Sequence, residues 1–306
     1  MGRLRVGFSS LIGSTGRSYR CTMSRVAVVV HHGRPRAREL AGQAIEWLTA
    51  HGHTAQVPKG DAEACGLEQW AADEAELGSG VDLALSLGGD GTMLRAVDLV
   101  APAGAAVLGV NVGHLGYLTE VGPDEMQDAL ERVTEGRHTV EERLVLEVET
   151  TTPKGESCRR TALNEAVVEK TTSGHTVSVA VDIDDEFFTS YVADGLIIAT
   201  PTGSTAYNFS VRGPILSPAV QALVLTPVAP HMLFDFSLVL PAAGTVRVTV
   251  REPSTAALVM DGHAEAVLQP GDSILCRTAE HPARLVTFGE RDFHSRLKAK
   301  FGLADR

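Results

Sequence analysis

The feature that most constrains the fold is a run of short, continuously apolar segments that alternate with amphipathic segments in the first half of the chain. Apolar runs stand at 26–30, 81–87 and 106–110, and helix-like stretches stand at 35–51 and 92–100. Strands that are apolar on both faces must be covered on both faces, which is typical of a parallel sheet flanked by helices. We therefore predict an N-terminal α/β domain with a Rossmann-like parallel sheet.

The second half of the chain has a different pattern. After a helix-like stretch at 123–133, short β-rich segments are separated by Gly, Pro and Asp turns: RLVLEVET, TVSVAVDID, LIIAT, SLVL, VRVTV, AALVM and ARLVTF. Repeated short strands with turn signals indicate a mostly β C-terminal domain. Residues 292–303 alternate basic and apolar side chains like a short helix, and we expect this tail to fold back on the first domain.

The chain length also favours two domains, since 306 residues exceed what one compact core usually holds. We expect residues 1–22 to be a disordered extension because they carry no apolar periodicity, although their arginines and serines also resemble a weak targeting segment. We expect residues 23–136 to form the α/β domain and 137–282 the β-rich domain. Residues 283–306 would then return to the first domain.

Charge and cysteine content exclude several classes of protein. With 27 Lys and Arg against 38 Asp and Glu, the formal net charge is −11, which argues against nucleic acid and anionic membranes as partners. The longest apolar stretch, 97–110, contains Asp98, Pro102 and Gly104, so it does not indicate a membrane span. The four cysteines form no C-x-x-C pair, which favours free thiols over disulfides or zinc. We expect a soluble cytoplasmic protein.

The strongest local motif is Gly88-Gly89-Asp90-Gly91-Thr92, which follows a buried strand and precedes a helix. Ligands of open α/β sheets bind beyond the carboxyl ends of the strands, where this motif would lie. The glycines allow backbone N–H groups to approach phosphates, and Thr92 can cap the helix, whose N-terminus favours anions. Asp90 then holds Mg²⁺ or accepts a proton from an attacking hydroxyl.

This motif differs from the two common phosphate-binding loops. It is not a P-loop, since the chain contains no Gly-Lys dipeptide, and it is not G-x-G-x-x-G, because Leu94 stands where the last glycine would be. The plain alternative is a tight turn between strand and helix in which Asp90 is a local cap.

Two other segments carry polar groups that suit a nucleotide. Asp194-Gly195 leads into an apolar strand and then into the hydroxyl-rich loop 201–210, whose side chains can bind a ribose or a pyrophosphate. The alternative is a polar surface loop. Asn164-Glu165 lies inside the apolar stretch 162–168, and a carboxylate that accepts from ribose hydroxyls is typical of dinucleotide sites. The alternative is an edge strand that exposes both side chains to water.

Together these motifs resemble the NAD kinase family. The resemblance rests on GGDGT at 88–92, GVNVGHLGYL at 109–118, NE at 164–165, and DG followed by TPTGSTAY within 194–207. GGDGT is shared with diacylglycerol and sphingosine kinases and resembles an element of phosphofructokinases, so it indicates kinase chemistry more than a substrate. The other motifs point to NAD.

The resemblance implies an ATP-dependent NAD kinase, which transfers the γ-phosphoryl group of ATP to the 2'-hydroxyl of the adenosine ribose of NAD and gives NADP and ADP. It implies an N-terminal α/β domain, a β-rich NAD-binding domain and a site at the interface between them. It also implies a divalent metal ion, expected to be Mg²⁺, and a homo-oligomer, either a dimer or a tetramer.

The resemblance also assigns roles to individual residues. Asp90 would be the catalytic base, and Asn164, Glu165 and Asp194 would contact the ribose and base. His175 stands where relatives often carry a basic residue, and Tyr117 where they often carry an aromatic against the ligand, with core packing as the alternative. The complete substrate-binding set implied is Gly89, Gly91, Thr92, Arg95, Tyr117, Asn164, Glu165, His175, Asp194, Thr205, Ala206, Tyr207, Asn208, Phe209 and Ser210.

The sequence also departs from the family pattern. Val211-Arg212 interrupts what is commonly SAGGP, Phe236 stands where many relatives have Arg, and His263 follows Asp261-Gly262 where they have Gln. These changes leave open which contacts the β-rich domain makes with the nucleotide. The sequence also leaves open whether the acceptor is NAD or NADH and whether the donor is ATP or polyphosphate. A lipid kinase is disfavoured by the net charge and by the lack of a basic amphipathic helix, and a non-catalytic nucleotide-binding protein by the intact Asp90.

Overall fold

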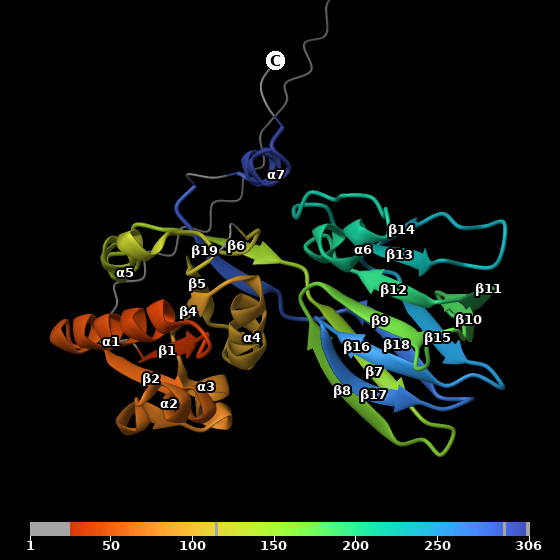
Figure 1. The fold of residues 1–306 in the computed structure, drawn as a ribbon, viewed down its shortest axis with the longest axis horizontal. Coiled ribbons are helices and arrows are strands. Elements are labelled where there is room, and N and C mark those ends of the chain that lie inside the picture. The colour runs from red at the N-terminus through yellow and green to blue at the C-terminus, as the bar shows by residue number, and fades with distance from the viewer. Residues whose placement is uncertain (1–24, 114–115, 290–291, 304–306) are drawn as a thin grey trace, which may run out of the picture.

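The chain forms two domains that lie side by side, with helix α7 (Phe293–Phe301) beyond their junction (Figure 1). This computed structural model describes residues 25–113, 116–289 and 292–303. The extension expected at 1–22 therefore lies outside the described residues. Within the described part, no helix is long and apolar enough to cross a membrane.

The first domain is built on a seven-stranded sheet in the order β3-β2-β1-β4-β5-β19-β6. Every pairing in it is parallel except that of β6 with β19. Its strands are β1 (Arg25–Val30), β2 (Thr54–Pro58), β3 (Ala71–Ala72), β4 (Leu83–Gly88), β5 (Ala106–Asn111), β6 (Thr139–Arg143) and β19 (Ala283–Thr287). Its helices are α1 (Pro35–Ala50), α2 (Lys59–Cys65), α3 (Glu74–Gly80), α4 (Asp90–Val100) and α5 (Met126–Thr134).

Both faces of this sheet are buried, which confirms the α/β prediction. Val26, Val28 and Val30 of β1 pack into one apolar cluster with α1 and α5. Ala27 and Val29 point the other way, into a second cluster with α3 and α4. Since successive side chains of a strand alternate between faces, a continuously apolar strand is what two helical layers require.

The second domain is a sandwich of two six-stranded antiparallel sheets, which confirms the mostly β prediction. One sheet has the order β11-β10-β15-β18-β7-β8 and the other β14-β13-β12-β9-β16-β17. A single apolar cluster contains residues from both sheets, such as Val179 and Ile274 from the first and Ile198 and Leu258 from the second. The core therefore lies between the two sheets.

The bounds of the sandwich elements follow. The strands are β7 (Leu146–Thr151), β8 (Ser157–Ala162), β9 (Glu165–Lys170), β10 (Val177–Ile183), β11 (Glu186–Ala193), β12 (Gly195–Ala199), β13 (Ala222–Val228), β14 (Leu238–Pro241), β15 (Val246–Val250), β16 (Ala256–Met260), β17 (His263–Leu268) and β18 (Ser273–Thr278). The short helix α6 (Tyr207–Ser210) follows the 3-10 turn η4 (Gly203–Thr205).

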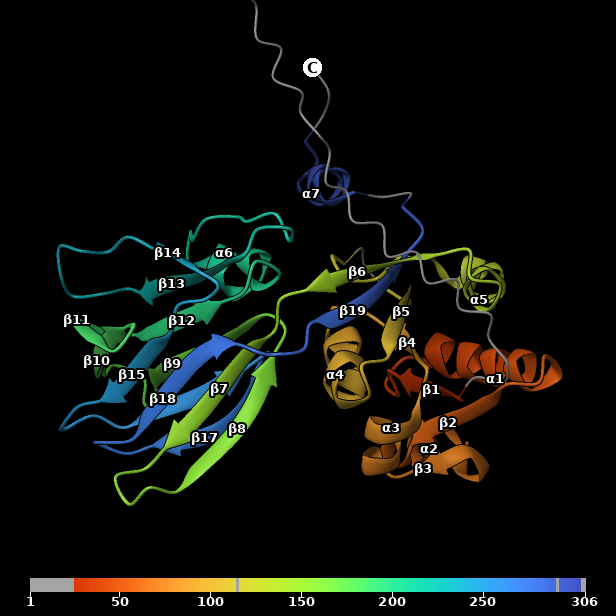
Figure 2. The same ribbon diagram turned by 180° about the vertical axis from the view of Figure 1, so that it is seen from behind.

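Two neighbouring strands carry the chain between the domains. β6 leads out of the first sheet, and β19 returns from the sandwich to pair with β5 on one side and β6 on the other. Figure 2 shows this pair crossing the junction between the domains. The first sheet thus combines strands that precede the sandwich in the sequence with one strand, β19, that follows it. Helix α7 comes after β19.

Candidate active site

A cavity of about 500 Å³ opens at the carboxyl ends of β1 and β4, where the parallel sheet predicts a ligand site. Five separate parts of the chain line it: the segment after β1, the turn from β4 into α4, the loop after β5, the start of β17 and α7. The lining residues are His31, His32, Arg34, Gly89, Asp90, Gly91, Thr92, Arg95, Gly116, His263 and Lys300.

The glycine-rich turn has the position that the sequence predicts, but its cap differs. β4 ends at Gly88 and α4 begins at Asp90, so Gly89 is the N-cap. Thr92 lies inside the first turn of the helix and does not cap it, which corrects our expectation. Its side chain packs on Gly88 instead, where an added Cβ would lie 2.1 Å from the Thr92 hydroxyl oxygen.

The Asp90 carboxylate is held in a fixed orientation. Its Oδ2 accepts from the backbone N–H of Tyr117 at 2.9 Å, and its Oδ1 accepts from that of Leu118 at 3.1 Å. Gly116 is needed for this approach, because a Cβ there would lie 2.1 Å from Oδ1. A carboxylate offers about four acceptor positions, so these two bonds leave acceptor capacity on the cavity side.

Three basic side chains line the same cavity as this carboxylate. Arg34 donates to the Val112 carbonyl at 2.7 Å, and Lys300 lies over the Tyr117 ring, 4.1 Å from its centroid. Arg95 donates to the Val30 carbonyl at 3.0 Å and also pairs with Asp61. Among the described residues that line the cavity, Asp90 is the only carboxylate. The cavity therefore concentrates positive charge in a chain whose formal charge is −11.

Most of these cations are absent from the site predicted from the sequence. Of them, only Arg95 was singled out, whereas Arg34 and Lys300 were not. Of the histidines that line the cavity, His263 was named only as a departure from the family pattern, and His31 and His32 were not named. The segment His31-His32-Gly33-Arg34 follows β1, the strand that neighbours β4, so the rule that located Asp90 could have found it. Lys300 carries no such signal, because it reaches the cavity only through the docking of α7.

Asn164 and Glu165 lie at the start of β9, a strand in the interior of its sheet. β9 runs between β12 and β16, so the edge-strand alternative for this pair is wrong. The Asp261 carboxylate accepts the backbone N–H groups of Leu163, Asn164 and Glu165 at 2.8, 2.8 and 3.1 Å. On the other side, the Thr200 N–H donates to the Asn164 carbonyl at 2.8 Å. The backbone of this segment is thus fixed from both sides.

Glu165 is an unusual carboxyl group. Its side chain is buried, and burial, reinforced by the charge of Asp261, raises its pKa to about 8, against a partial opposing effect of the Tyr207 backbone N–H. Burial also raises the pKa of Asp261. The Glu165 Oε2 atom has no hydrogen-bond partner among the described residues. A buried, unpaired carboxyl oxygen is well suited to bind a ligand hydroxyl.

The hydroxyl-rich loop packs directly on this segment. A Cβ at Gly203 would lie 2.0 Å from the Asn164 carbonyl oxygen, so only glycine permits the contact. Asn208 is fully buried, and its amide donates to the Ser204 and Pro214 carbonyls and accepts from Thr226. The Asn208 side chain therefore holds the loop together from inside.

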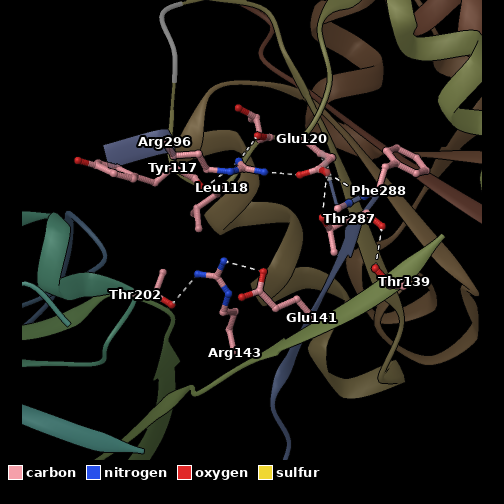
Figure 3. A network of polar contacts seen from close by, with 12 residues as sticks. Tyr117, Leu118, Glu120, Thr139, Glu141, Arg143, Thr202, Thr287, Phe288 and Arg296 are labelled. Carbon is pink, nitrogen blue, oxygen red and sulfur yellow. Dashed lines mark hydrogen bonds and ion pairs between the residues drawn. The ribbon is translucent and has the colours of Figure 1, made fainter. Parts of the chain in front are cut away.

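A second cavity, of about 250 Å³, lies between this loop, the first domain and α7. Its lining includes Tyr117 and Thr205, which the sequence analysis assigned to the substrate, and Arg143, which it did not. Figure 3 shows Arg143 between Glu141 and Thr202, to which its guanidinium donates at 2.9 and 3.4 Å. Tyr117 thus faces a cavity, and burial followed by the nearby Asp90 charge raises its pKa.

Other predicted site residues lie away from both cavities. Asp194 pairs with Lys170 at 2.7 Å and contributes with it to the electrostatic surroundings of Tyr207. His175 is exposed in the turn that precedes β10. Of the departures from the family pattern, His263 lines the first cavity, whereas Phe236 is exposed on the sandwich.

Comparison with known proteins assigns both domains. Residues 26–138 match the ATP-NAD kinase N-terminal domain, and residues 163–288 match the ATP-NAD kinase C-terminal domain. The chain is 39% identical over 280 residues to an NAD kinase of Moorella thermoacetica, with 91% of this chain and 89% of that one covered. It is 40% identical over 282 residues to an NAD kinase of Heliobacterium modesticaldum, with 91% and 98% covered.

Solved structures give the same answer. A yeast NADH kinase complexed with NADH superimposes with a TM-score of 0.84 at 26% identity, covering 93% of this chain and 89% of that one. An NAD kinase from Archaeoglobus fulgidus in complex with ATP superimposes with a TM-score of 0.65 at 26% identity, covering 91% and 97%. With both domains matched and relatives aligned over most of its length, this chain belongs to the NAD kinase family.

Proposed function

We propose that the protein transfers the γ-phosphoryl group of ATP to the 2'-hydroxyl of the adenosine ribose of NAD, giving NADP and ADP. The observation that carries the proposal is the Asp90 carboxylate, fixed by two backbone N–H groups inside a cavity otherwise lined by basic and small residues. The relatives named NAD kinase and the solved kinases in complex with NADH and with ATP support the same substrates.

The ATP phosphates are proposed to lie in the first cavity. Arg34, Arg95 and Lys300 supply positive charge there, and the start of α4 presents its free N–H groups. An added Cβ at Gly89 or Gly91 would meet no atom within 4 Å, so both glycines leave open space beside the turn. Phosphoryl transfer needs positioning and charge stabilisation more than covalent help from the protein, and this lining provides both.

The acceptor ribose is proposed to meet Asp90 from the side of the sandwich. Tyr117 and Thr205 would contact the adenosine part of NAD in the second cavity, and Glu165 with Asn164 would bind ribose hydroxyls. Asp90 would orient the 2'-hydroxyl and accept its proton as the hydroxyl oxygen attacks the γ-phosphorus. The two bonds from the 117–118 backbone would keep the carboxylate aimed during this step.

Mg²⁺ fits the donor set of the first cavity. Asp90 offers a carboxylate with acceptor positions left over, and among the described residues no cluster of three His, Cys, Asp or Glu forms a closed protein cage. Mg²⁺ commonly binds through one or two carboxylates together with substrate phosphates and water. Asp90 would hold the ion, which when bound would neutralise charge on the phosphoryl oxygens.

We also propose a cytoplasmic homo-oligomer. The cysteines that the structure describes, Cys65, Cys158 and Cys276, are free, which supports a reducing compartment. Large apolar side chains are exposed on the sandwich, notably Phe187, Phe236 and Leu233. Exposed apolar side chains of this kind favour contact with a second copy. Light scattering after size exclusion should give a dimer or tetramer mass, and a monomer at micromolar concentration would refute this.

An assay of NADP formation tests the reaction. Purified protein is incubated with ATP, NAD and Mg²⁺, each varied separately, and NADP is detected with an NADP-specific dehydrogenase. We expect NADP only when all three are present and no phosphorylation of diacylglycerol or sphingosine. Lipid phosphorylation without NADP would overturn the proposal in favour of a lipid kinase.

A further inference from the structure

We infer that Arg296 on the C-terminal helix is a positioning residue for Asp90, acting through the backbone between Tyr117 and Thr119. The inference rests on the proposed role of Asp90. Arg296 lines the second cavity but not the first, and it is separated from Asp90 by 206 positions in the sequence, so neither the sequence nor the first cavity links the two residues.

The contacts of Arg296 are unusually concentrated. Its guanidinium donates to the Tyr117 carbonyl at 3.2 Å and to the Thr119 carbonyl at 2.5 Å, and it also pairs with Glu120 (Figure 3). Only 11% of the Arg296 side chain and 5% of the Glu120 side chain are exposed. The rigid, planar guanidinium is suited to hold several acceptors at once, which a lysine ammonium on a flexible stem does less well.

One peptide group joins Arg296 to Asp90. The Tyr117 carbonyl, which accepts from Arg296, belongs to the same planar unit as the Leu118 N–H, which donates to Asp90 Oδ1 at 3.1 Å. Arg296 therefore fixes the carbonyl end of this peptide group, and the Asp90 carboxylate binds its N–H end. Hydrogen bonds in such a chain also polarise one another, so the guanidinium strengthens the Leu118 N–H as a donor.

The arginine itself is anchored to the first sheet. Glu120 accepts from the Thr287 hydroxyl at 2.9 Å and from the Phe288 N–H at 2.8 Å, which ties the pair to the end of β19. Phe301 of the same helix packs on Phe209 of the sandwich, with ring centroids 5.0 Å apart. The helix thus links the loop over Asp90 to a rigid strand and to the second domain.

The test compares Arg296→Gln with Arg284→Gln. Arg284 is a matched control, since it lies on β19, pairs with Glu142 and donates to the Gly104 carbonyl at 3.2 Å, away from the active site. We expect Arg296→Gln to lower kcat about 10- to 100-fold, as small displacements of a catalytic group do, with little change in KM for ATP. Arg284→Gln should leave kcat close to that of the wild type.

A double-mutant cycle with Asp90→Asn separates positioning from general stability. If Arg296 acts through Asp90, Arg296→Gln should not lower kcat further in the Asp90→Asn background. An equal loss of kcat in both backgrounds would overturn the inference. If Asp90→Asn alone leaves kcat unchanged, the proposed role of Asp90 fails; if Asp90→Asn is impaired but Arg296→Gln is fully active, only the inference fails.

Two further measurements cover a variant that folds poorly. Arg296→Lys keeps the charge opposite Glu120 but loses the planar fork, so we expect a partial loss of kcat with a wild-type melting temperature. Hydrogen exchange of the Tyr117 and Leu118 backbone N–H groups should accelerate in Arg296→Lys and not in Arg284→Gln. Unchanged exchange and unchanged kcat in Arg296→Lys would overturn the inference.

Discussion

Glu165 and Asp261 are two neighbouring carboxyl groups, one buried and one partly buried, that differ in their hydrogen-bond partners. Asp261 accepts three successive N–H groups, an arrangement that satisfies a carboxylate inside a protein. Glu165 has one oxygen without a partner among the described residues. The first group therefore holds the segment in place, and the second keeps an unused acceptor position.

The free oxygen of Glu165 leads to a kinetic prediction. Glu165→Gln keeps the size of the side chain and replaces a carboxyl oxygen by an amide that donates. Because the ionised group would accept from ribose hydroxyls of one nucleotide only, KM for NAD measured above pH 8 should rise about tenfold, the value of one hydrogen bond of roughly 1.4 kcal/mol, and KM for ATP should change less. Steady-state kinetics with each substrate varied checks this. Equal effects on both KM values would place Glu165 outside the NAD site.

The same residue predicts a pH dependence of stability. Folding raises the pKa of Glu165 from an ordinary 4.5 to about 8, so between these values the folded chain binds a proton that the unfolded chain has lost. The free energy of unfolding should therefore decrease as pH rises through this interval, by at most about 1.4 kcal/mol per pH unit from this group. Glu165→Gln should flatten that decrease in urea unfolding. Parallel pH profiles for the two proteins would contradict the buried carboxyl.

Residue roles were predictable from the sequence only where a motif and its place in the fold coincide. Asp90 was found because a carboxylate in a glycine-rich turn after an apolar strand has few structural explanations. Arg34, Lys300 and Arg296 were not found, since single basic residues carry no periodicity and reach the site through tertiary contacts. Thr92 was misassigned because a threonine near a helix start is common at the cap and equally able to pack on Gly88.

At the scale of elements, the turn between β16 and β17 is the part that positions the proposed NAD-binding segment, residues 163–165. Asp261 has a left-handed backbone with φ of 48°, and its carboxylate replaces the strand pairing that ends there. Two residues later, His263 lines the first cavity. One turn therefore contacts both proposed nucleotide sites.

Asp261→Asn should loosen this arrangement. Asparagine tolerates the left-handed backbone, but its amide nitrogen must oppose at least one of the three N–H donors. We expect a loss of about 1–3 kcal/mol in stability and a larger rise in KM for NAD than for ATP. Asp184→Asn is the control, since Asp184 also has a positive φ, 52°, and accepts the Thr245 N–H at 2.8 Å, but is exposed. Comparable kinetic changes in both variants would refute a local role for Asp261.

Element types followed from the sequence, whereas sheet neighbours did not. Apolar runs predicted the central strands of the first sheet, and helix α1 ends at Ala50, one residue before the predicted end. The pattern could not reveal that β9 lies inside its sheet, because alternation reports burial and not the order of strands. Nor could it show that β19 sits between β5 and β6, since its pairing with β5 joins segments more than 170 residues apart.

At the scale of the whole molecule, the net charge is negative while the basic residues of one cavity are positive. The chain carries a formal charge of −11, yet Arg34, Arg95 and Lys300 converge on one cavity. Salt screens such interactions, with a Debye length of about 10 Å at 0.1 M and about 3 Å at 1 M ionic strength. KM for ATP should therefore rise with NaCl more steeply than KM for NAD. Equal salt dependence would argue against phosphate binding in this cavity.

The central claim is that Asp90 accepts the proton of the attacking 2'-hydroxyl, and Asp90→Asn tests it most directly. The substitution keeps size and polarity but removes the charge and the ability to accept a proton. NADP formation is measured under saturating ATP and NAD over a range of Mg²⁺ concentrations, with folding checked by circular dichroism. We expect kcat to fall by about 10²–10⁴ and added Mg²⁺ to recover only the part of the rate that is due to weaker metal binding, because the proton acceptor is still absent. A folded Asp90→Asn protein with nearly wild-type kcat would contradict the claim.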